Sequence, residues 1–78
     1  MELLRKLQTP EQSPAGLSPQ DMRLLKLLTE GHQNKSAAAA MGISVHTVNF
    51  HLRSIHEKLH VHSRSEAVAR ALREGLVP

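Results

Sequence analysis

The stretch that decides the fold is Asn34–Leu59, NKSAAAAMGISVHTVNFHLRSIHEKL. Gly42 predicts the end of a first helix, because glycine adopts the left-handed backbone of a helix end without strain. Ser44 is placed to cap a second helix, since its hydroxyl can accept from a free amide of the next turn. Ile43 and Val48 have the spacing of a hydrophobic staple, which fixes the angle at which the second helix leaves. The pattern predicts a helix-turn-helix.

The second helix, residues 45–59, has one apolar and one polar face. Its apolar residues fall on a narrow stripe at helical spacing, and they are Val48, Leu52, Ile55 and Leu59. The opposite face carries His46, Asn49, Phe50, Arg53 and Glu57. Asparagine can bond adenine and arginine can bond guanine through two hydrogen bonds each in the major groove. An ordinary solvated face would also fit this helix, and the turn before it favours DNA binding.

A helix is predicted before this motif. Ser18 is placed as its N-cap, Pro19 stands at the first helical position, and Asp21 can close a capping box. Gly31 is expected to stop this helix. Within the motif, we expect Asn34 to cap a helix over residues 34–41.

A last helix is predicted after the motif. Ser63 is its expected N-cap, Glu66 has the spacing of a second capping box, and Gly75 is expected to end the helix. Four helices with short loops and no strand signal predict an all-α fold, a four-helix bundle.

Composition narrows the function further. The chain has 78 residues, no cysteine and a formal net charge of +3. This length suits one small domain, and the charge favours a polyanionic partner. The absence of cysteine excludes disulfides, thiol catalysis and cysteine-based zinc sites. No apolar run approaches the roughly 18 residues of a membrane span, so no membrane contact is expected. The absence of cysteine fits a reducing cytoplasm, which is the expected location. A chain this small cannot enclose a catalytic pocket, so no enzyme activity and no cofactor are expected.

The N-terminal segment, residues 1–16, differs from the rest. Gln8–Gly16, QTPEQSPAG, contains two prolines and a glycine and has no apolar periodicity, which is typical of a linker. We expect residues 1–16 to be a linker and the tail of a missing upstream domain, followed by a DNA-binding domain at 17–78. A disordered natural N-terminus is the alternative.

The chain from Leu17 to Leu76 resembles the LuxR-type (GerE-like) DNA-binding domain, an output module of bacterial response regulators and quorum-sensing regulators. The matching motifs are LSP at 17–19, LLTEG at 27–31, NK at 34–35, GIS at 42–44, TV at 47–48, KL at 58–59 and SR at 63–64. The resemblance implies a four-helix bundle with its third helix in the major groove and its fourth helix in a dimer contact. It also implies an upstream receiver domain, double-stranded DNA as a partner and RNA polymerase as another partner.

The resemblance also implies site residues. Base contacts are expected from Asn49, Phe50, Arg53 and, on the same face, His46. Phosphate contacts are expected from Asn34, Lys35, Thr47, His51 and Lys58. The dimer contact is expected from Ala67, Val68 and Ala71, in a homodimer that is weak without DNA. Asn49 stands where many relatives have lysine, and Phe50 stands where a smaller residue is usual, so the operator sequence does not carry over.

Other interpretations stay open at this point. A quorum-sensing regulator would contain the same domain, and a promoter-binding sigma-factor region shares the helix-turn-helix. A helical protein-interaction module is the alternative from another class. His56 and His60 have the spacing of two zinc ligands on a helix, with His62 nearby. No cysteine or free carboxylate completes that set, so no metal is expected.

Overall fold

The computed structural model describes residues 16–77, and helices are the only regular elements among them. They are α2 (Pro19–Thr29), α3 (Asn34–Met41), α4 (Val45–Leu59) and α5 (Arg64–Arg73). The all-α fold and the helix-turn-helix, formed by α3 and α4, are therefore confirmed. The predicted linker lies outside the described residues, apart from Gly16 at its end.

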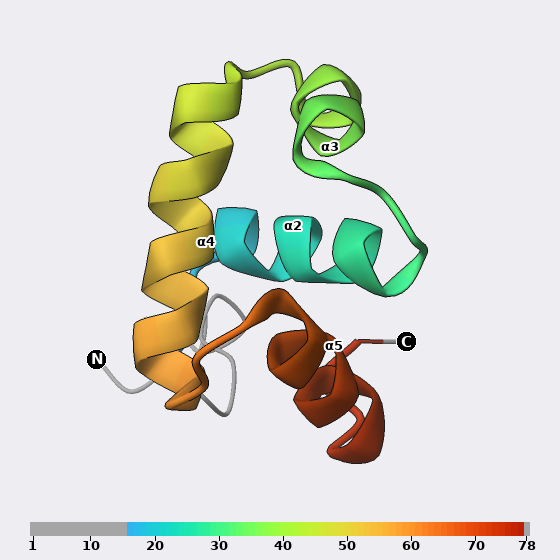
Figure 1. Cartoon of the computed structure of the whole chain (residues 1–78), viewed down its shortest axis with the longest axis vertical. Coiled ribbons are helices and arrows are strands. Elements are labelled where there is room, and N and C mark those ends of the chain that lie inside the picture. Colours follow the sequence, from blue (N-terminus) through green and yellow to red (C-terminus); the bar gives the residue numbers. More distant parts are fainter. Residues whose placement is uncertain (1–15, 78) are drawn as a thin grey trace, which may run out of the picture.

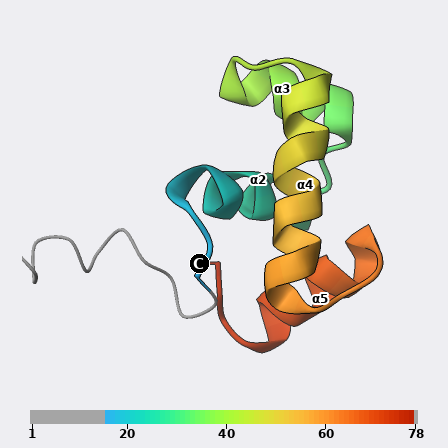
Figure 2. The same ribbon diagram turned by 90° about the vertical axis from the view of Figure 1, so that its left-hand side faces the viewer.

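Helix α4 runs along one side of the molecule and contacts each of the other three helices (Figure 1). Helix α2 crosses it near the middle, α3 lies beside its N-terminal end, and α5 lies beside its C-terminal end. Figure 2 shows α2 behind α4, with α3 and α5 at opposite ends. One long side of α4 consequently faces away from the bundle.

The core is built from aliphatic side chains of all four helices. Its helical members are Leu24, Leu25, Leu28, Ala37, Ala38, Val48, Ile55, Leu59, Ala67 and Ala71. The predicted apolar stripe of α4 is confirmed, with Leu52 half-buried at its edge. Burying each large aliphatic side chain contributes about 1.5–3 kcal/mol. The alanines let α3 and α5 approach the leucines of α2 closely.

Capping groups define where the helices begin and end. The Ser18 hydroxyl accepts from the Asp21 amide at 3.1 Å, and the Asp21 carboxylate accepts from the Ser18 amide at 3.2 Å. The predicted capping box of α2 is therefore confirmed. Gly42 closes α3 with a left-handed φ of 70°, and the Ser44 hydroxyl accepts from the Thr47 amide at 3.1 Å. The predicted glycine end of α3 and the predicted serine cap of α4 are therefore confirmed.

Two capping predictions were wrong. Gln33, without a side-chain bond, is the N-cap of α3, and Asn34 is its first helical residue. The Asn34 side chain instead bonds to side chains on α4 and α5. Ser63 caps α5, but the Glu66 carboxylate accepts from the His62 amide at 2.6 Å, one residue before the N-cap. The second capping box is therefore not closed.

Candidate nucleic-acid interface

The four predicted base-contacting side chains lie together on the outer face of α4. They line one open hollow of about 310 Å³, here called the α4 hollow, and they are His46, Asn49, Phe50 and Arg53. Residues 45–59 form the helix that carries them, as predicted. The hollow combines an aromatic ring, an amide, a guanidinium and an imidazole. Such a set can contact base edges through both hydrogen bonds and apolar surface.

Phe50 is the most unusual member of the hollow. It is the chain's single aromatic residue, yet 66% of it is exposed. Its ring meets the His51 ring edge-on, with centroids 5.5 Å apart and planes at 74°. An aromatic ring that lies outside the hydrophobic core is consistent with a role at a binding surface.

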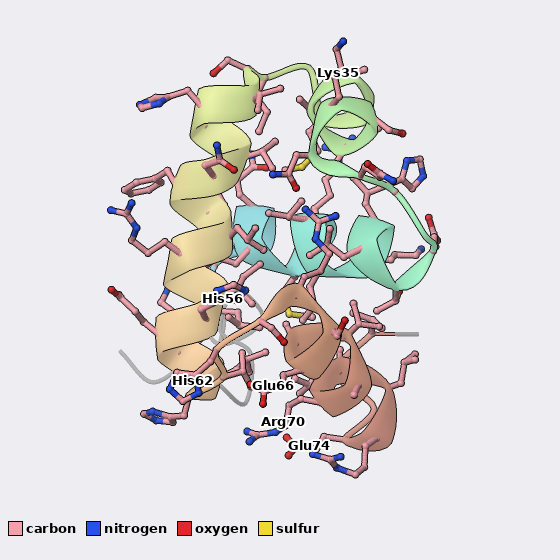
Figure 3. All side chains as sticks on the ribbon, viewed as in Figure 1. Lys35, His56, His62, Glu66, Arg70 and Glu74 are labelled. Carbon is pink, nitrogen blue, oxygen red and sulfur yellow. The ribbon has the colours of Figure 1, made fainter. Side chains whose placement is uncertain are left out.

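The first turn of α4 lies at one end of the molecule, beside α3 (Figure 1). Lys35 is exposed and points away from the bundle at the end where α4 begins (Figure 3). Thr47 is half-buried, and its hydroxyl lies 3.0 Å from the Ser44 hydroxyl, so its side chain belongs to the α4 cap. Three of the predicted phosphate contacts lie on the first turns of α3 and α4. Of these, Lys35 is exposed, whereas Asn34 and Thr47 are half-buried.

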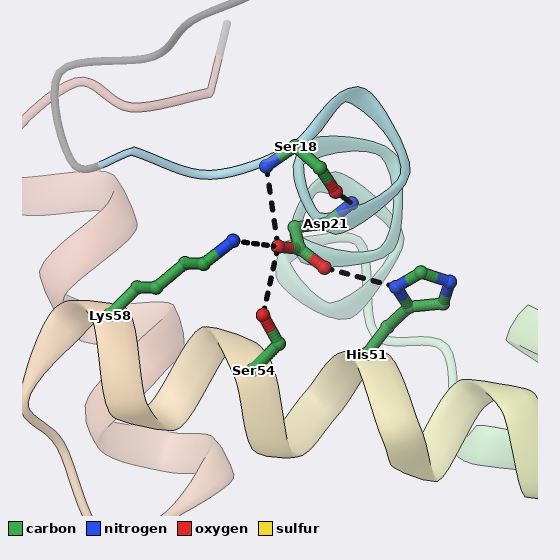
Figure 4. A network of polar contacts seen from close by, with 5 residues as sticks. All are labelled: Ser18, Asp21, His51, Ser54 and Lys58. Atoms are coloured by element: carbon green, nitrogen blue, oxygen red, sulfur yellow. Dashed lines mark hydrogen bonds and ion pairs between the residues drawn. The ribbon is translucent and has the colours of Figure 1, made fainter.

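His51 and Lys58 face α2 rather than an open surface. The Nδ1 of His51 lies 3.0 Å from Oδ1 of Asp21, and the Nζ of Lys58 donates to its Oδ2 at 3.1 Å (Figure 4). Ser54 donates to the same Oδ2 at 3.1 Å. The side chain of His51 is only 18% exposed and that of Lys58 is 37% exposed. A phosphate role for these two residues stays a prediction.

Asp21, Ser18, His51, Ser54 and Lys58 form what we call the Asp21 network. Asp21 is 1% exposed and is the one buried charged residue among residues 16–77. Burial raises the pKa of Asp21, while hydrogen bonds from Lys58, the Ser18 amide and His51 lower that pKa further than burial raises it. The carboxylate therefore stays ionised and ties the first turn of α2 to α4. The capping box signalled Asp21 in the sequence, but its partners on α4 had no sequence signal.

Two of the three residues predicted for the dimer contact are buried in the monomer. Ala67 and Ala71 are fully buried in the monomer, because they pack into the core shared with α2 and α4. They leave no surface for a second copy. Val68 is half-buried, and Leu72 is 61% exposed. Leu72 is therefore the large apolar side chain that α5 presents to solvent.

The histidines near the end of α4 lie in different environments. His56 is half-buried, and its Nε2 has no hydrogen-bond partner among the described residues. His60 ends α4 in a left-handed conformation with a φ of 58°. Between Gly16 and Val77, no three histidine, aspartate or glutamate side chains form a group that could hold a metal ion.

The opposite end of the molecule holds a second polar cluster. His62, Glu66, Arg70 and Glu74 lie together there (Figure 3). Arg70 donates to the Leu59 carbonyl at 2.9 Å and pairs with Glu74 at 3.3 Å. This arginine is occupied in closing the α4–α5 connection. Over the described part of the chain, no helix has the length and apolar character of a membrane span.

Comparisons with known proteins agree with this geometry. The family model GerE, described as bacterial regulatory proteins of the luxR family, matches residues 15–71. The chain is 44% identical over 62 residues to the HTH-type transcriptional activator RamA of Corynebacterium glutamicum, covering 80% of this chain and 22% of RamA. It is 34% identical over 61 residues to the response regulator VraR of Staphylococcus aureus, covering 78% of this chain and 29% of VraR.

A solved structure extends the likeness to the fold. The crystal structure of the response regulator ChrA, of a heme-sensing two-component system, superposes with a TM-score of 0.76 at 33% identity. The match covers 96% of this chain and 36% of ChrA. The chain thus spans between 22% and 36% of the length of these relatives.

The fold, the α4 hollow and these matches define a helix-turn-helix DNA-binding domain of a transcriptional regulator. The chain belongs to the luxR family of bacterial regulatory proteins, which is a family of transcription regulators.

Proposed function

We propose that α4 lies in the major groove and that the side chains of the α4 hollow contact base edges there. The observation that carries this proposal is the hollow itself. Its four lining residues are exposed on one face of the helix that follows the turn, while the apolar stripe of the opposite face packs into the core. An α-helix fits the width of the major groove, and its N-terminal half carries most base contacts in helix-turn-helix proteins.

Phosphate contacts would flank this helix. Lys35 supplies an exposed cation beside the first turn of α3, where free amides also favour an anion. Thr47 lies close to this end, on the first turn of α4. These contacts would orient the domain on DNA without selecting a sequence.

Pairing of two copies would complete an operator complex. The exposed Leu72, with Val68 one turn before it, gives α5 a small apolar surface. One short helix buries far less than the roughly 1,200 Å² of a stable interface. We therefore propose a monomer in dilute solution that pairs on two half-sites about one helical turn apart.

The whole regulator is a further part of the proposal. VraR and ChrA are named as response regulators, and RamA is named as a transcriptional activator. These names support a two-component response regulator. We further propose for it a cytoplasmic location, an upstream receiver domain and RNA polymerase as a partner. A quorum-sensing regulator with the same output domain is the second candidate.

A titration with random-sequence duplex DNA tests the proposal. The chain should bind this duplex at low salt, and the logarithm of its affinity should fall linearly with the logarithm of salt concentration, because bound cations release counterions. A helical protein-interaction module would show no binding at any salt concentration. That outcome would contradict the proposed function.

A further inference from the structure

A series of hydrogen bonds joins α5, α3 and the α4 hollow. The Arg64 guanidinium donates through Nη2 to Oδ1 of Asn34, and its Nη1 donates to the His32 carbonyl at 3.4 Å. The Nδ2 of Asn34 then donates to Oδ1 of Asn49 at 2.9 Å. We call this series the Arg64–Asn34–Asn49 relay. It connects a residue of the α4 hollow to two residues that do not line the hollow.

The direction of the relay follows from the chemistry of its first member. A guanidinium has five donors and no acceptor. The Asn34 side chain must therefore turn its oxygen toward Arg64, which leaves its NH2 group toward Asn49. Asn49 must then accept this bond with its own oxygen. An asparagine amide can otherwise turn over, because its two ends have nearly the same size. Here the arginine determines the orientation of both amides.

The consequence lies at the α4 hollow. The Oδ1 of Asn49 uses one of its two lone pairs for Asn34, so the NH2 of Asn49 is the group most free to bond a base. The two-bond contact between asparagine and adenine needs both the oxygen and the NH2, since adenine offers N7 as an acceptor and N6 as a donor. Guanine offers two adjacent acceptors, N7 and O6. A donor therefore suits guanine better than adenine.

We infer that the Arg64–Asn34–Asn49 relay holds Asn49 as a hydrogen-bond donor, so that this position selects guanine rather than adenine. The inference rests on the proposed function, because it needs α4 in the major groove. Asn34 and Arg64 act in it as positioning residues that do not themselves touch the base. This role replaces the phosphate contact that the sequence suggested for Asn34.

The first experiment locates the base. The full 78-residue chain selects duplexes from a randomised pool, and the selection is repeated with Asn49→Ala. The operator position whose preference disappears in Asn49→Ala is the one that Asn49 contacts. We expect guanine there in the wild-type selection. Adenine at that position, or no position affected by Asn49→Ala, would overturn the inference while leaving the proposed function standing.

The second experiment reverses the relay. Asn34→Asp keeps an oxygen for Arg64 but has no proton to give to Asn49 at neutral pH. Asn49 should then turn over, donate its NH2 to the new carboxylate and present its oxygen to the base. The preference should move from guanine to adenine or cytosine, which offer N6 and N4 donors, by about tenfold or more. The acidic group at the start of α3 is compatible with the helix dipole, so the fold should tolerate it.

Two controls separate this role from a structural one. Asn34→Ala removes the relay without supplying an acceptor, so it should relax the preference at that position without moving it to adenine. Circular dichroism checks that both variants keep the helix content of the wild type. A guanine preference unchanged in folded Asn34→Asp would overturn the inference. Failure of the wild-type chain to enrich any sequence would overturn the proposed function, and the inference with it.

Discussion

The ammonium group of Lys58 lies 3.1 Å from the carboxylate of Asp21, although the two residues are 37 positions apart in the chain. This bond joins the first turn of α2 to the last turn of α4. The same carboxylate bonds to Ser54 and His51, which lie one and two turns earlier on α4, respectively. The orientation of the helix that carries the α4 hollow thus depends on a buried acidic group on another helix.

Replacing this acid should weaken the fold. Asp21→Asn removes the charge and one acceptor, so the remaining donors of the Asp21 network lose their charge-assisted bonds. We expect the free energy of unfolding to fall by about 1–3 kcal/mol, measured by urea denaturation. Ser54→Ala removes one neutral donor and should cost less, about 0.5–1.5 kcal/mol. An Asp21→Asn variant as stable as the wild type would show that the network does not hold α2 against α4.

The same carboxylate should make stability depend on pH. The pKa of Asp21 in the folded chain lies below its usual value of 3.8, so the stabilisation is complete above that value. It should be lost as the pH falls through the lowered pKa, because protonation removes the bonds to Lys58 and His51. Urea midpoints measured from about pH 6 to about pH 2 should therefore decline less in Asp21→Asn than in the wild type. Parallel declines would place the acid sensitivity in other groups.

Phe50 should matter for binding rather than for folding. Because 66% of the residue is exposed, Phe50→Ala should change the free energy of unfolding by less than about 0.5 kcal/mol. Ile55→Ala, on the buried face of the same helix, should cost about 2–5 kcal/mol and is the matched control. DNA affinity should fall in Phe50→Ala if the ring meets a thymine methyl group. A large loss of stability without DNA would assign the ring to the core.

Leu72 offers a test of pairing on DNA. Leu72→Glu puts a charge on the apolar surface of α5 and should leave folding intact, because the side chain is 61% exposed. Cooperative binding to a duplex with two half-sites should be lost, while binding to one half-site should persist. Gln20→Glu adds the same charge to an exposed position on α2 and should keep cooperativity. Sedimentation with each duplex measures the stoichiometry, and unchanged pairing in Leu72→Glu would exclude this surface.

Local chemistry explains how much of the fold could be predicted. The bounds of α4 follow from the Ser44 cap and a regular apolar stripe, and the turn before it follows from Gly42. These signals lie within a few residues of the structure they determine. The clustering of the four residues that line the α4 hollow could be predicted for the same reason, since all of them share one helix face.

The errors concern contacts between distant segments. Asn34 carries the signal of an N-cap, but Arg64 and Asn49 are brought beside it by tertiary packing and take its side chain. Ala67 and Ala71 suggested an open surface because they are small, and they proved to be the residues that let α5 approach the core. Helical spacing gives the face of a residue, but it does not tell which of two partners covers that face.

We propose that the outer face of α4 recognises base sequence, and replacement of Arg53 gives the sharpest test of that role. The affinities of wild-type, Arg53→Ala and Lys35→Ala chains are measured for a duplex selected by the wild type and for a scrambled duplex. Arg53→Ala should lose about 1–3 kcal/mol on the selected duplex and much less on the scrambled one. Lys35→Ala should weaken both equally and reduce the salt slope by about one unit. An equal loss on both duplexes in Arg53→Ala would contradict the claim.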